Sequence, residues 1–378
     1  MDTATWASTL SNGCGATPSS SKSAGVRSKP IRKTSPRTSA VILSGFAASR
    51  RSCPNRSFAA LGVGALLLGL ATLRAGTGLA REASAETSRT TAQVRFFFAG
   101  NGRLQLRHGH FEETLDVRYR QPNGAYDEEA LQRIAHFFRS RGDGRSEAVS
   151  LRLVELLAYI QERYRARPMI LLSGYRSPEF NSALGAQGQA VAFASLHTQA
   201  LAADIALPQL DLQKLWLRLR EERVGGVGFY RRQRFLHIDV GPPRFWEEAT
   251  SRVGENLSAG NARIFARTDF DRYDTLSGAR IRLHSVTALP LRVHAIVRAE
   301  GEDQAVLGRL RPLSVPALAD GDCWLIREPA AAYEFEIQAD DHRPQGWQRR
   351  RLALEITFCP PLVERTPGMV RTNLVELR

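Results

Sequence analysis

The sequence predicts an α+β domain, in which helices accompany a small antiparallel sheet, followed by an all-β, sandwich-like domain. Over residues 86–247, short apolar runs with the alternation of strands are separated by helical stripes. Residues 255–378 instead contain short strand-like runs separated by Pro, Gly and Asp turns, which favours a second, all-β domain. The 378 residues suffice for two such domains and an N-terminal extension over residues 1–85.

The N-terminal extension has the composition of a targeting segment. Residues 1–56 are rich in Ser, Thr, Pro and Arg without an apolar period, so we expect them to be disordered. Arg50 and Arg51 then precede an uncharged run at residues 57–73 and an Ala-x-Ala cleavage pattern at residues 83–85. This order is typical of a Tat-like or Sec signal peptide, and the run is short for a membrane span. We expect a periplasmic protein with no stable membrane span after signal cleavage; the alternative is an inner-membrane anchor facing the periplasm.

The formal net charge of +14 is unevenly distributed. Residues 1–85 hold 11 basic and 2 acidic residues, against 41 and 36 in the rest of the chain. Beyond residue 85 every basic residue except Lys214 is an arginine, which indicates genome composition more than a polyanion-binding surface. Because no basic helix or basic–aromatic motif is present, we expect no nucleic-acid partner.

Four cysteines occur in the chain. Cys14 and Cys53 lie in the segment that we expect to be removed, whereas Cys323 and Cys359 remain in the second domain. In an exported protein this pair can form a disulfide, and two buried free thiols are the alternative. No cysteine pair has the spacing of zinc ligands.

The first part of the mature chain predicts a sheet entry. Apolar and polar residues alternate over residues 92–120, and Gly100-Asn101-Gly102 is a hairpin signal, so we expect three antiparallel strands here. His108 and His110 fall at a turn of this segment. An H-x-H pair can bind a metal, but we interpret it as a solvated hairpin tip.

Two helices and a polar loop follow. The first helix is predicted to begin after Asp127, a plausible N-cap, and the second covers residues 147–165. A short apolar strand at residues 168–172 ends in the loop Ser173-Gly-Tyr-Arg-Ser-Pro178. A polar cluster beside a glycine at a strand end is a common place for functional side chains.

Two later stretches place ionisable side chains in runs that are otherwise small or apolar. His197 and Asp204 lie seven residues apart in the first, and His237 and Asp239 lie in the second. Such groups cost desolvation energy in an apolar setting unless a metal or partner compensates. A strand from residue 201 puts Asp204 on the face away from the bulkier apolar residues.

The second stretch follows a glycine-rich segment in the pattern of a hairpin. Its period of two places His237 and Asp239 on one face of the strand. Two strands of neighbouring hairpins can therefore present Asp204 and His237 on one surface, with His197 at the entrance to the first. Two imidazoles and one carboxylate suit one Zn²⁺ ion and leave a fourth position for water. The alternative is a core histidine beside unrelated carboxylates.

Four motifs taken in order resemble the M15 metallopeptidases, in the exported DUF882 branch. They are Ser173-Gly-Tyr-Arg-Ser, Ser-x-His-x-x-Ala-x-Ala-x-Asp, Gly-Gly-Val-Gly-Phe-Tyr and His-Ile-Asp. The resemblance covers about residues 92–247 and implies an M15 or hedgehog-type peptidase domain. It further implies a zinc-dependent peptidase that hydrolyses peptide cross-links of peptidoglycan by metal-activated water.

The resemblance also suggests roles for individual residues. It implies one Zn²⁺ held by His197, Asp204 and His237. Arg176 resembles the family's substrate-positioning arginine, which would hold a substrate carboxylate or the developing oxyanion. Tyr175 and Ser195 resemble supporting residues in substrate binding.

The chain departs from the family pattern at two positions. Ala200 stands in a predicted strand where Gly is usual, and Arg234 stands where many members carry the acid that acts as general base. Asp239, on the same strand face as His237, is our candidate for a catalytic base or for a residue that orients the histidine.

Two other functions remain open at this point. A non-catalytic zinc or cell-wall binding module would retain the ligands but lack the base. A carboxypeptidase would trim stem peptides instead of cutting cross-links. The second domain lies outside the resemblance and shows no chemistry of its own.

Overall fold

The computed structural model describes residues 94–378, apart from residues 189–190, 253–254, 302–304, 315 and 340–349. These residues belong to one compact unit of the chain, residues 69–378. The predicted extension and signal segment, residues 1–85, lie outside the described part. Within it, none of the helices is both long and apolar enough to cross a membrane.

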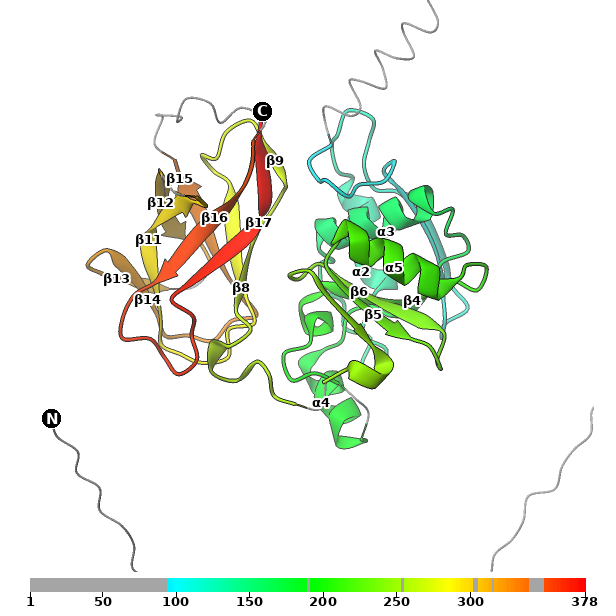
Figure 1. The fold of residues 1–378 in the computed structure, drawn as a ribbon. Coiled ribbons are helices and arrows are strands. Elements are labelled where there is room, and N and C mark those ends of the chain that lie inside the picture. Colours follow the sequence, from blue (N-terminus) through cyan, green and yellow to red (C-terminus); the bar gives the residue numbers. More distant parts are fainter. Residues whose placement is uncertain (1–93, 189–190, 253–254, 302–304, 315, 340–349) are drawn as a thin grey trace, which may run out of the picture. The chain divides into compact units, whose positions relative to one another are not determined.

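Two large sheets organise the described residues, and helices accompany the first (Figure 1). Its strands follow the order β2-β1-β3-β4-β6-β5-β7. These strands are β1 (Arg103–His108), β2 (Thr114–Arg118), β3 (Ile170–Ser173), β4 (Ala202–Ala206), β5 (Gly226–Tyr230), β6 (Phe235–Asp239) and β7 (Arg244–Glu247). The accompanying helices are α2 (Glu128–Phe137), α3 (Leu151–Arg163), α4 (Pro178–Ala186) and α5 (Leu212–Glu222), with short 3₁₀ turns η1 (Leu196–Gln199) and η2 (Glu248–Thr250).

The first sheet is larger than predicted and is mixed. The β1–β3 and β5–β7 pairs are parallel, whereas the other pairs are antiparallel. The prediction of a small antiparallel sheet was therefore wrong in these two respects. β7 was missed because its four residues follow the Gly-Pro-Pro turn at residues 241–243, which masks a short edge strand.

The expected three-stranded entry is a two-stranded hairpin, β1 and β2. Residues 94–98 form no strand; instead, the carbonyl of Arg95 accepts hydrogen bonds from the backbone of Asp271 and Arg272. The Phe97 amide donates to the Asp271 carboxylate at 2.8 Å. The apolar alternation of this segment thus reflects burial of residues such as Phe96, not a third strand.

Helix α2 begins as the sequence predicts, because the Asp127 side chain accepts a hydrogen bond from the Ala130 amide at 2.9 Å. Helix α3 begins later than predicted, after Ser150. It places an unusual pair inside the protein: Glu155 is fully buried and binds Arg120 at 2.6 Å. The hydroxyls of Tyr119 and Tyr126 also donate to the Glu155 carboxylate, which satisfies its acceptor capacity.

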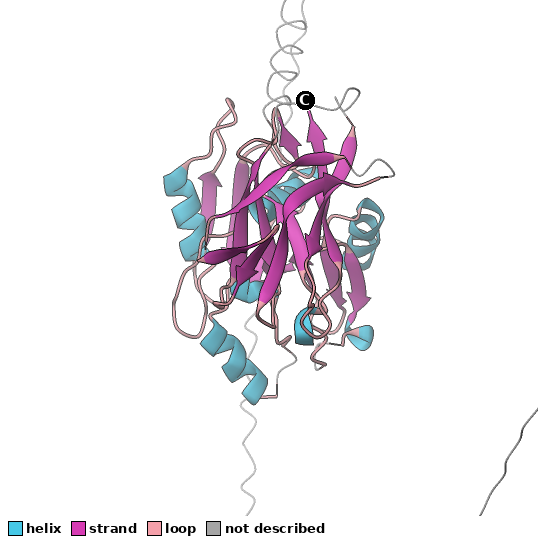
Figure 2. Cartoon of the chain, turned by 90° about the vertical axis from the view of Figure 1, so that its left-hand side faces the viewer, coloured by secondary structure: helices cyan, strands magenta, loops and turns pink. Residues whose placement is uncertain are grey.

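The second sheet is formed by the later part of the chain, whose described residues after position 261 contain strands and no helix (Figure 2). Its main path runs β8-β10-β15-β12-β11-β16-β17-β9, and β13 and β14 attach to β11. After the 3₁₀ turn η3 (Ala259–Asn261), its strands are β8 (Phe265–Thr268), β9 (Arg272–Tyr273), β10 (Arg280–His284), β11 (Leu291–Ala299), β12 (Val306–Pro312), β13 (Ala317–Asp320), β14 (Cys323–Ile326), β15 (Ala332–Gln338), β16 (Arg351–Phe358) and β17 (Met369–Leu377).

Hydrogen bonds join these strands into one continuous sheet instead of the two facing sheets of a sandwich. The sheet curls, so that β8 at one end of the strand order contacts β17 near the other end. In this contact the Thr268 amide donates to Asn373 Oδ1 at 3.0 Å. The all-β prediction is therefore met, while the division into two sheets is not seen in the strand pairing. Cys323 and Cys359 form a disulfide, which decides between the two states that the sequence left open.

Candidate metal centre

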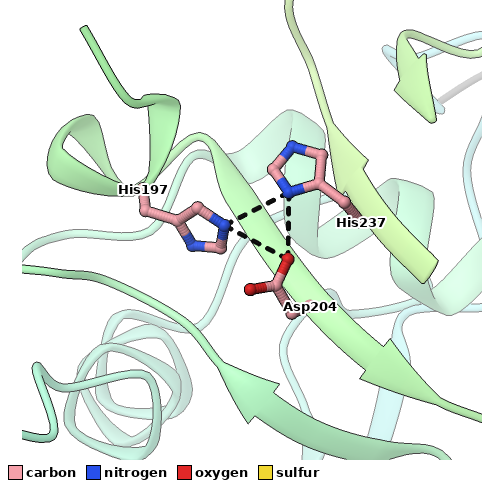
Figure 3. A group of neighbouring side chains, drawn as sticks. All are labelled: His197, Asp204 and His237. Carbon is pink, nitrogen blue, oxygen red and sulfur yellow. Dashed lines mark hydrogen bonds and ion pairs between the residues drawn. The ribbon is translucent and has the colours of Figure 1, made fainter. Parts of the chain in front are cut away.

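The pairing of β4 with β6 places Asp204 directly opposite His237 (Figure 3). Residues opposite each other in an antiparallel pair direct their side chains to the same face of the sheet. Small and apolar residues surround both positions and bury the two strands, so the register leaves little freedom for these two polar groups. The period-two reading of both strands predicted this shared face.

His197 approaches the same point from η1, immediately before β4. The 3₁₀ turn ends at Ala200, whose φ of 53° lies in the left-handed region. The prediction that Ala200 lies in a strand was therefore wrong. A left-handed residue at the end of a turn favours glycine. This explains why glycine is usual in the family at the position of Ala200.

The three side chains converge closely. His197 Nε2 lies 3.3 Å from Asp204 Oδ1 and 3.2 Å from His237 Nδ1, and His237 Nδ1 lies 2.9 Å from the same carboxylate oxygen. The candidate ligand atoms all lie within 4.8 Å of one another. Among the described residues, this is the one group of three or more His, Cys, Asp or Glu side chains with such geometry.

The outer nitrogen of each histidine has a hydrogen-bond acceptor. His197 Nδ1 lies 2.7 Å from the Gly174 carbonyl oxygen, and His237 Nε2 lies 3.0 Å from Asp239 Oδ2. Both acceptors lack hydrogens, so each outer nitrogen can donate its proton to them. The tautomer protonated on the outer nitrogen is the one whose inner nitrogen can bind a metal. This donor set of two imidazole nitrogens and a carboxylate fits Zn²⁺.

Burial and mutual contacts shift the titration of these groups. Burial, together with the Arg176 guanidinium, lowers the pKa of His197. Burial also opposes the charged form of His237, but the carboxylates of Asp204 and Asp239 outweigh it and raise the pKa. Burial opposes the charge of Asp204 too, yet the two histidines hold its pKa well below the ordinary value. The carboxylate is therefore ionised, as a metal ligand must be.

Asp239 is fully buried behind His237 and every side of its carboxylate is occupied. It accepts from Arg244 at 2.6 and 3.1 Å, from the Gly241 amide at 2.8 Å and from the Gly226 amide at 3.3 Å, besides His237. Of the two roles considered for Asp239, this setting favours orientation of the histidine over proton transfer.

The same part of the chain matches known proteins. A family model described as peptidoglycan L,D-endopeptidase MepK matches residues 98–246. The peptidoglycan L,D-endopeptidase MepK of Escherichia coli K12 is 34% identical over 144 residues, which cover 38% of this chain and 79% of that protein. The chain belongs to the M15 peptidase family, as a murein endopeptidase K-like member. The probable MepK of Haemophilus influenzae is 28% identical over 146 residues, 38% of this chain and 78% of that protein. No solved structure matches the chain significantly.

In this murein endopeptidase K-like region, the glycines of β5 explain how the centre is packed. A Cβ at Gly226 would lie 2.2 Å from the Asp239 carboxylate, and one at Gly228 would lie 2.5 Å from the Trp246 indole. The Trp246 ring in turn lies 5.3 Å from the His237 ring. The missing side chains thus make room for the two groups that hold His237.

Arg244 and Trp246, which the sequence analysis missed, complete this support. Arg244 pairs with Asp239, and its guanidinium lies 5.3 Å from the Trp246 ring centroid. Their signal was an Arg-Phe-Trp run five residues after Asp239. This run does not predict the contact, because no period links β7 to the preceding strand across the turn.

Two hydrogen bonds hold Arg176 beside the centre. Its Nη2 donates to Asp204 Oδ2 at 2.6 Å, and its Nε donates to Ser173 Oγ at 2.9 Å. Arg176 therefore holds the carboxylate oxygen that faces away from the histidines, a contact that the sequence did not indicate. Tyr175 and Ser195 are both buried and line the same cleft.

The three converging side chains open onto a cleft of about 870 Å³. Its walls include Arg176 and Trp246 beside the centre, and Tyr230 and Phe235 farther along the β5–β6 hairpin. Arg234, the residue at the position of the usual general base, is exposed at the turn of this hairpin with a φ of 58°. It does not line the cleft.

Proposed function

We propose that this chain is an exported, zinc-dependent peptidase that cuts L,D cross-links of peptidoglycan. The observation that carries the proposal is the convergence of His197, Asp204 and His237, with the inner nitrogens of both histidines beside the Asp204 carboxylate, inside the region similar to MepK. The relatives' name supplies the substrate and bond type, and the buried cluster supports a reaction that uses a metal.

His197, Asp204 and His237 would hold one Zn²⁺ ion. When bound, the ion supplies Lewis acidity, which polarises a peptide carbonyl and makes water nucleophilic at neutral pH. Asp239 and the Gly174 carbonyl keep the two imidazole rings in the tautomers that binding requires. Without these acceptors, either ring could turn a protonated nitrogen toward the centre.

Arg176 would have two tasks in this proposal. Its Nε and Nη2 hold Ser173 and Asp204, while Nη1 makes no hydrogen bond to any of the described residues. That remaining group of donors is available to a carboxylate or a developing oxyanion in the cleft. Tyr175 and Ser195 would shape the neighbouring wall as substrate-binding residues.

The activity can be tested with defined muropeptides. The purified protein with Zn²⁺ should cleave dimers joined by an L,D bond, and chelation should abolish cleavage. Matched dimers with a D,D bond and monomeric stem peptides serve as controls. His197→Ala should lose both bound zinc and cleavage; if it retains both, the site assignment is wrong.

Two alternatives give different results in the same assay. The departure at Arg234 motivates a non-catalytic zinc or cell-wall binding module, which would bind zinc and peptidoglycan but release no product. A carboxypeptidase would release the terminal residue of monomeric stem peptides, but the similarity to MepK gives this option no support.

The proposal includes a location and a domain division. Residues 1–85 would comprise the extension and signal, residues 86–247 the peptidase domain and residues 255–378 an accessory domain. Export to the periplasm places the chain beside its substrate. Cell fractionation with and without residues 1–85 tests the export signal: loss of periplasmic protein upon deletion supports it, and unchanged export contradicts it.

A further inference from the structure

Two of the arginines that line the cleft have no carboxylate partner among the described residues. Six arginines line the cleft, and four of them pair with carboxylates: Arg139 with Glu113, Arg176 with Asp204, Arg244 with Asp239 and Arg252 with Glu255. Arg141 and Arg263 have no carboxylate partner among the described residues. Arg263 is exposed and lies beyond the matched region, whereas Arg141 lies within it.

Arg141 is held in place although its side chain is exposed. Its Nη1 lies 2.6 Å from His110 Nε2, and its guanidinium lies 6.0 Å from the Phe180 ring centroid. Burial, with a contribution from Arg141, lowers the pKa of His110 and so keeps the ring neutral and able to accept. The histidine therefore fixes the arginine without cancelling its charge.

These contacts also give a role to the H-x-H pair. His108 Nδ1 accepts hydrogen bonds from the amides of His110 and Phe111, at 3.1 and 3.2 Å. This contact shapes the turn that presents His110 to Arg141. The two histidines serve the turn and the arginine, and neither belongs to a cluster of three potential metal ligands within the described part of the chain.

The loop that carries Arg141 is fixed to the loop that carries Arg176. Asp143 Oδ2 accepts from Ser177 Oγ at 2.5 Å, and the Tyr175 amide donates to the Phe138 carbonyl at 2.7 Å. A Cβ at Gly142 would lie 2.1 Å from the Phe180 ring, so the loop lies flat on that side chain. Arg141 thus has a defined position relative to the metal centre.

We propose that Arg141, held by His110 and Phe180, binds a free carboxylate of the peptide substrate. This inference depends on the proposed function, because it concerns which part of a peptidoglycan stem peptide the cleft recognises. Stem peptides carry free carboxylates beside their peptide bonds, and the fork of donors in arginine matches such a group. Arg176, by contrast, already spends two of its nitrogens on Ser173 and Asp204.

Binding to the metal-free protein tests the inference without any need for turnover. A stem tetrapeptide with free carboxylates and its carboxamide analogue are titrated calorimetrically into the wild type. We expect the carboxylate form to bind about tenfold more tightly or better, the range of a charge-assisted hydrogen bond. Arg141→Gln should remove this preference, and Arg141→Lys, which keeps the charge but loses the fork, should retain part of it.

Two further variants test the mechanism of positioning. Arg145→Gln is the matched control, because Arg145 lies on the same loop but pairs with Glu179 and does not line the cleft. It should keep the full preference. His110→Ala should weaken it, and His110→Gln, whose amide oxygen can accept, should restore part of it. Thermal melting of each variant checks that the fold is intact.

Several outcomes would overturn the inference. They are equal binding of the two peptides by the wild type, a preference retained in Arg141→Gln, and a preference lost in Arg263→Gln instead. If the wild type cleaves L,D dimers but Arg141→Gln discriminates as before, the inference alone fails. If Arg141-dependent binding is present but no cross-link is cut, the proposed function fails while the carboxylate site stands.

Discussion

Two carboxylates contact opposite nitrogens of the His237 ring, and their surroundings differ. Asp204 faces the convergence of the three side chains, whereas Asp239 lies behind the ring in a shell of Arg244 and backbone amides. A buried carboxylate with all its lone pairs engaged holds an imidazole well, but it exposes no face to a water in the cleft. These different surroundings fit the proposed roles of the two residues, Asp204 as a metal ligand and Asp239 as the group that orients His237.

Asp239→Asn tests this separation. We expect zinc affinity to fall about 10- to 100-fold, because the amide loses the Arg244 pair and holds the His237 ring less firmly. Competition with a chromophoric chelator measures the affinity. Asp211→Asn, a change between two good N-cap residues on α5, should leave it unaltered. Unchanged zinc affinity with abolished turnover would instead indicate a catalytic base.

His284 gives a prediction of acid sensitivity. Burial, followed by the charges of Arg282 and Arg267, lowers the pKa of His284 to about 3, and its Nδ1 lies 2.7 Å from Gln199 Oε1. Below the unfolded-state pKa of about 6.5, the unfolded chain binds a proton that the folded protein does not. Stability should therefore fall as pH decreases from 6.5 toward 3, by up to about 1.4 kcal/mol per pH unit.

Urea unfolding at several pH values measures this effect. His284→Gln removes the titrating group but keeps a side chain able to hydrogen-bond. The difference in unfolding free energy between wild type and variant should change with pH below 6.5 and stay constant above it. A difference that is constant over the whole range would contradict the assignment.

Strand β5 determines how closely β7 can approach His237. Its glycines leave the space that Asp239 and Trp246 fill, as the short distances from a hypothetical Cβ show. We expect Gly226→Ala and Gly228→Ala each to destabilise the protein by about 1–3 kcal/mol through overpacking and to weaken zinc binding. Chemical unfolding and zinc titration provide the two measurements.

Gly185→Ala is the control for these substitutions. Gly185 lies in helix α4, and an added Cβ would meet only a Val191 methyl at 3.4 Å. Alanine in a helix should be neutral or stabilise by up to about 1 kcal/mol. If the β5 variants behave like this control, the glycines are not needed for packing around His237.

The sequence could predict this site as far as strand periodicity extends. The period of two predicted which face of its strand carries Asp204, and it predicted that His237 and Asp239 share one face of theirs. The β4–β6 register then places Asp204 and His237 on the same face of the sheet. Periodicity carries no information about contacts across turns, so Arg244 and Trp246 were missed. The backbone of Gly174, which orients His197, was also beyond reach, because any residue offers a carbonyl.

Helix α3 contributes a buried charge whose effect on stability can be tested. Glu155 and Arg120 form an ion pair that is almost completely buried. Glu155→Gln leaves the Arg120 charge without its partner, so we expect a loss of about 3–5 kcal/mol in unfolding free energy. Asp116→Asn breaks the exposed pair with Arg103 and should cost less than about 1 kcal/mol. Equal losses in the two variants would contradict the buried-charge argument.

For the whole molecule, composition and turn spacing predicted a helix-containing part and an all-β part. They could not predict how the strands pair. Apolar alternation at residues 94–98 looked like a strand, but its backbone bonds go to Asp271, far along the chain. Likewise, one curled sheet and two facing sheets bury the same alternating residues, so the pattern alone does not separate them.

The disulfide should affect the stability of the second sheet without affecting zinc binding at the first. Cys323 lies in β14 and Cys359 directly follows β16; both strands pair with β11, so the bond closes a loop within the second sheet. With a sequence separation of 36 residues, the cross-link should contribute about 3–4 kcal/mol by restricting the unfolded chain. The double variant Cys323→Ala and Cys359→Ala should therefore unfold at lower temperature. Its zinc affinity should not change, because the three candidate ligands lie on β4 and β6 of the first sheet and on η1 directly before β4.

Scanning calorimetry and zinc titration of the same samples measure both effects. Wild-type protein treated with a thiol reductant should show the same lowered transition as the double variant, and the reductant should not affect the variant further. An unchanged transition after reduction would mean that the bond contributes little to stability. A loss of zinc affinity in the double variant would mean that the second sheet helps to hold the metal centre, which would give the accessory domain a structural part in the proposed reaction.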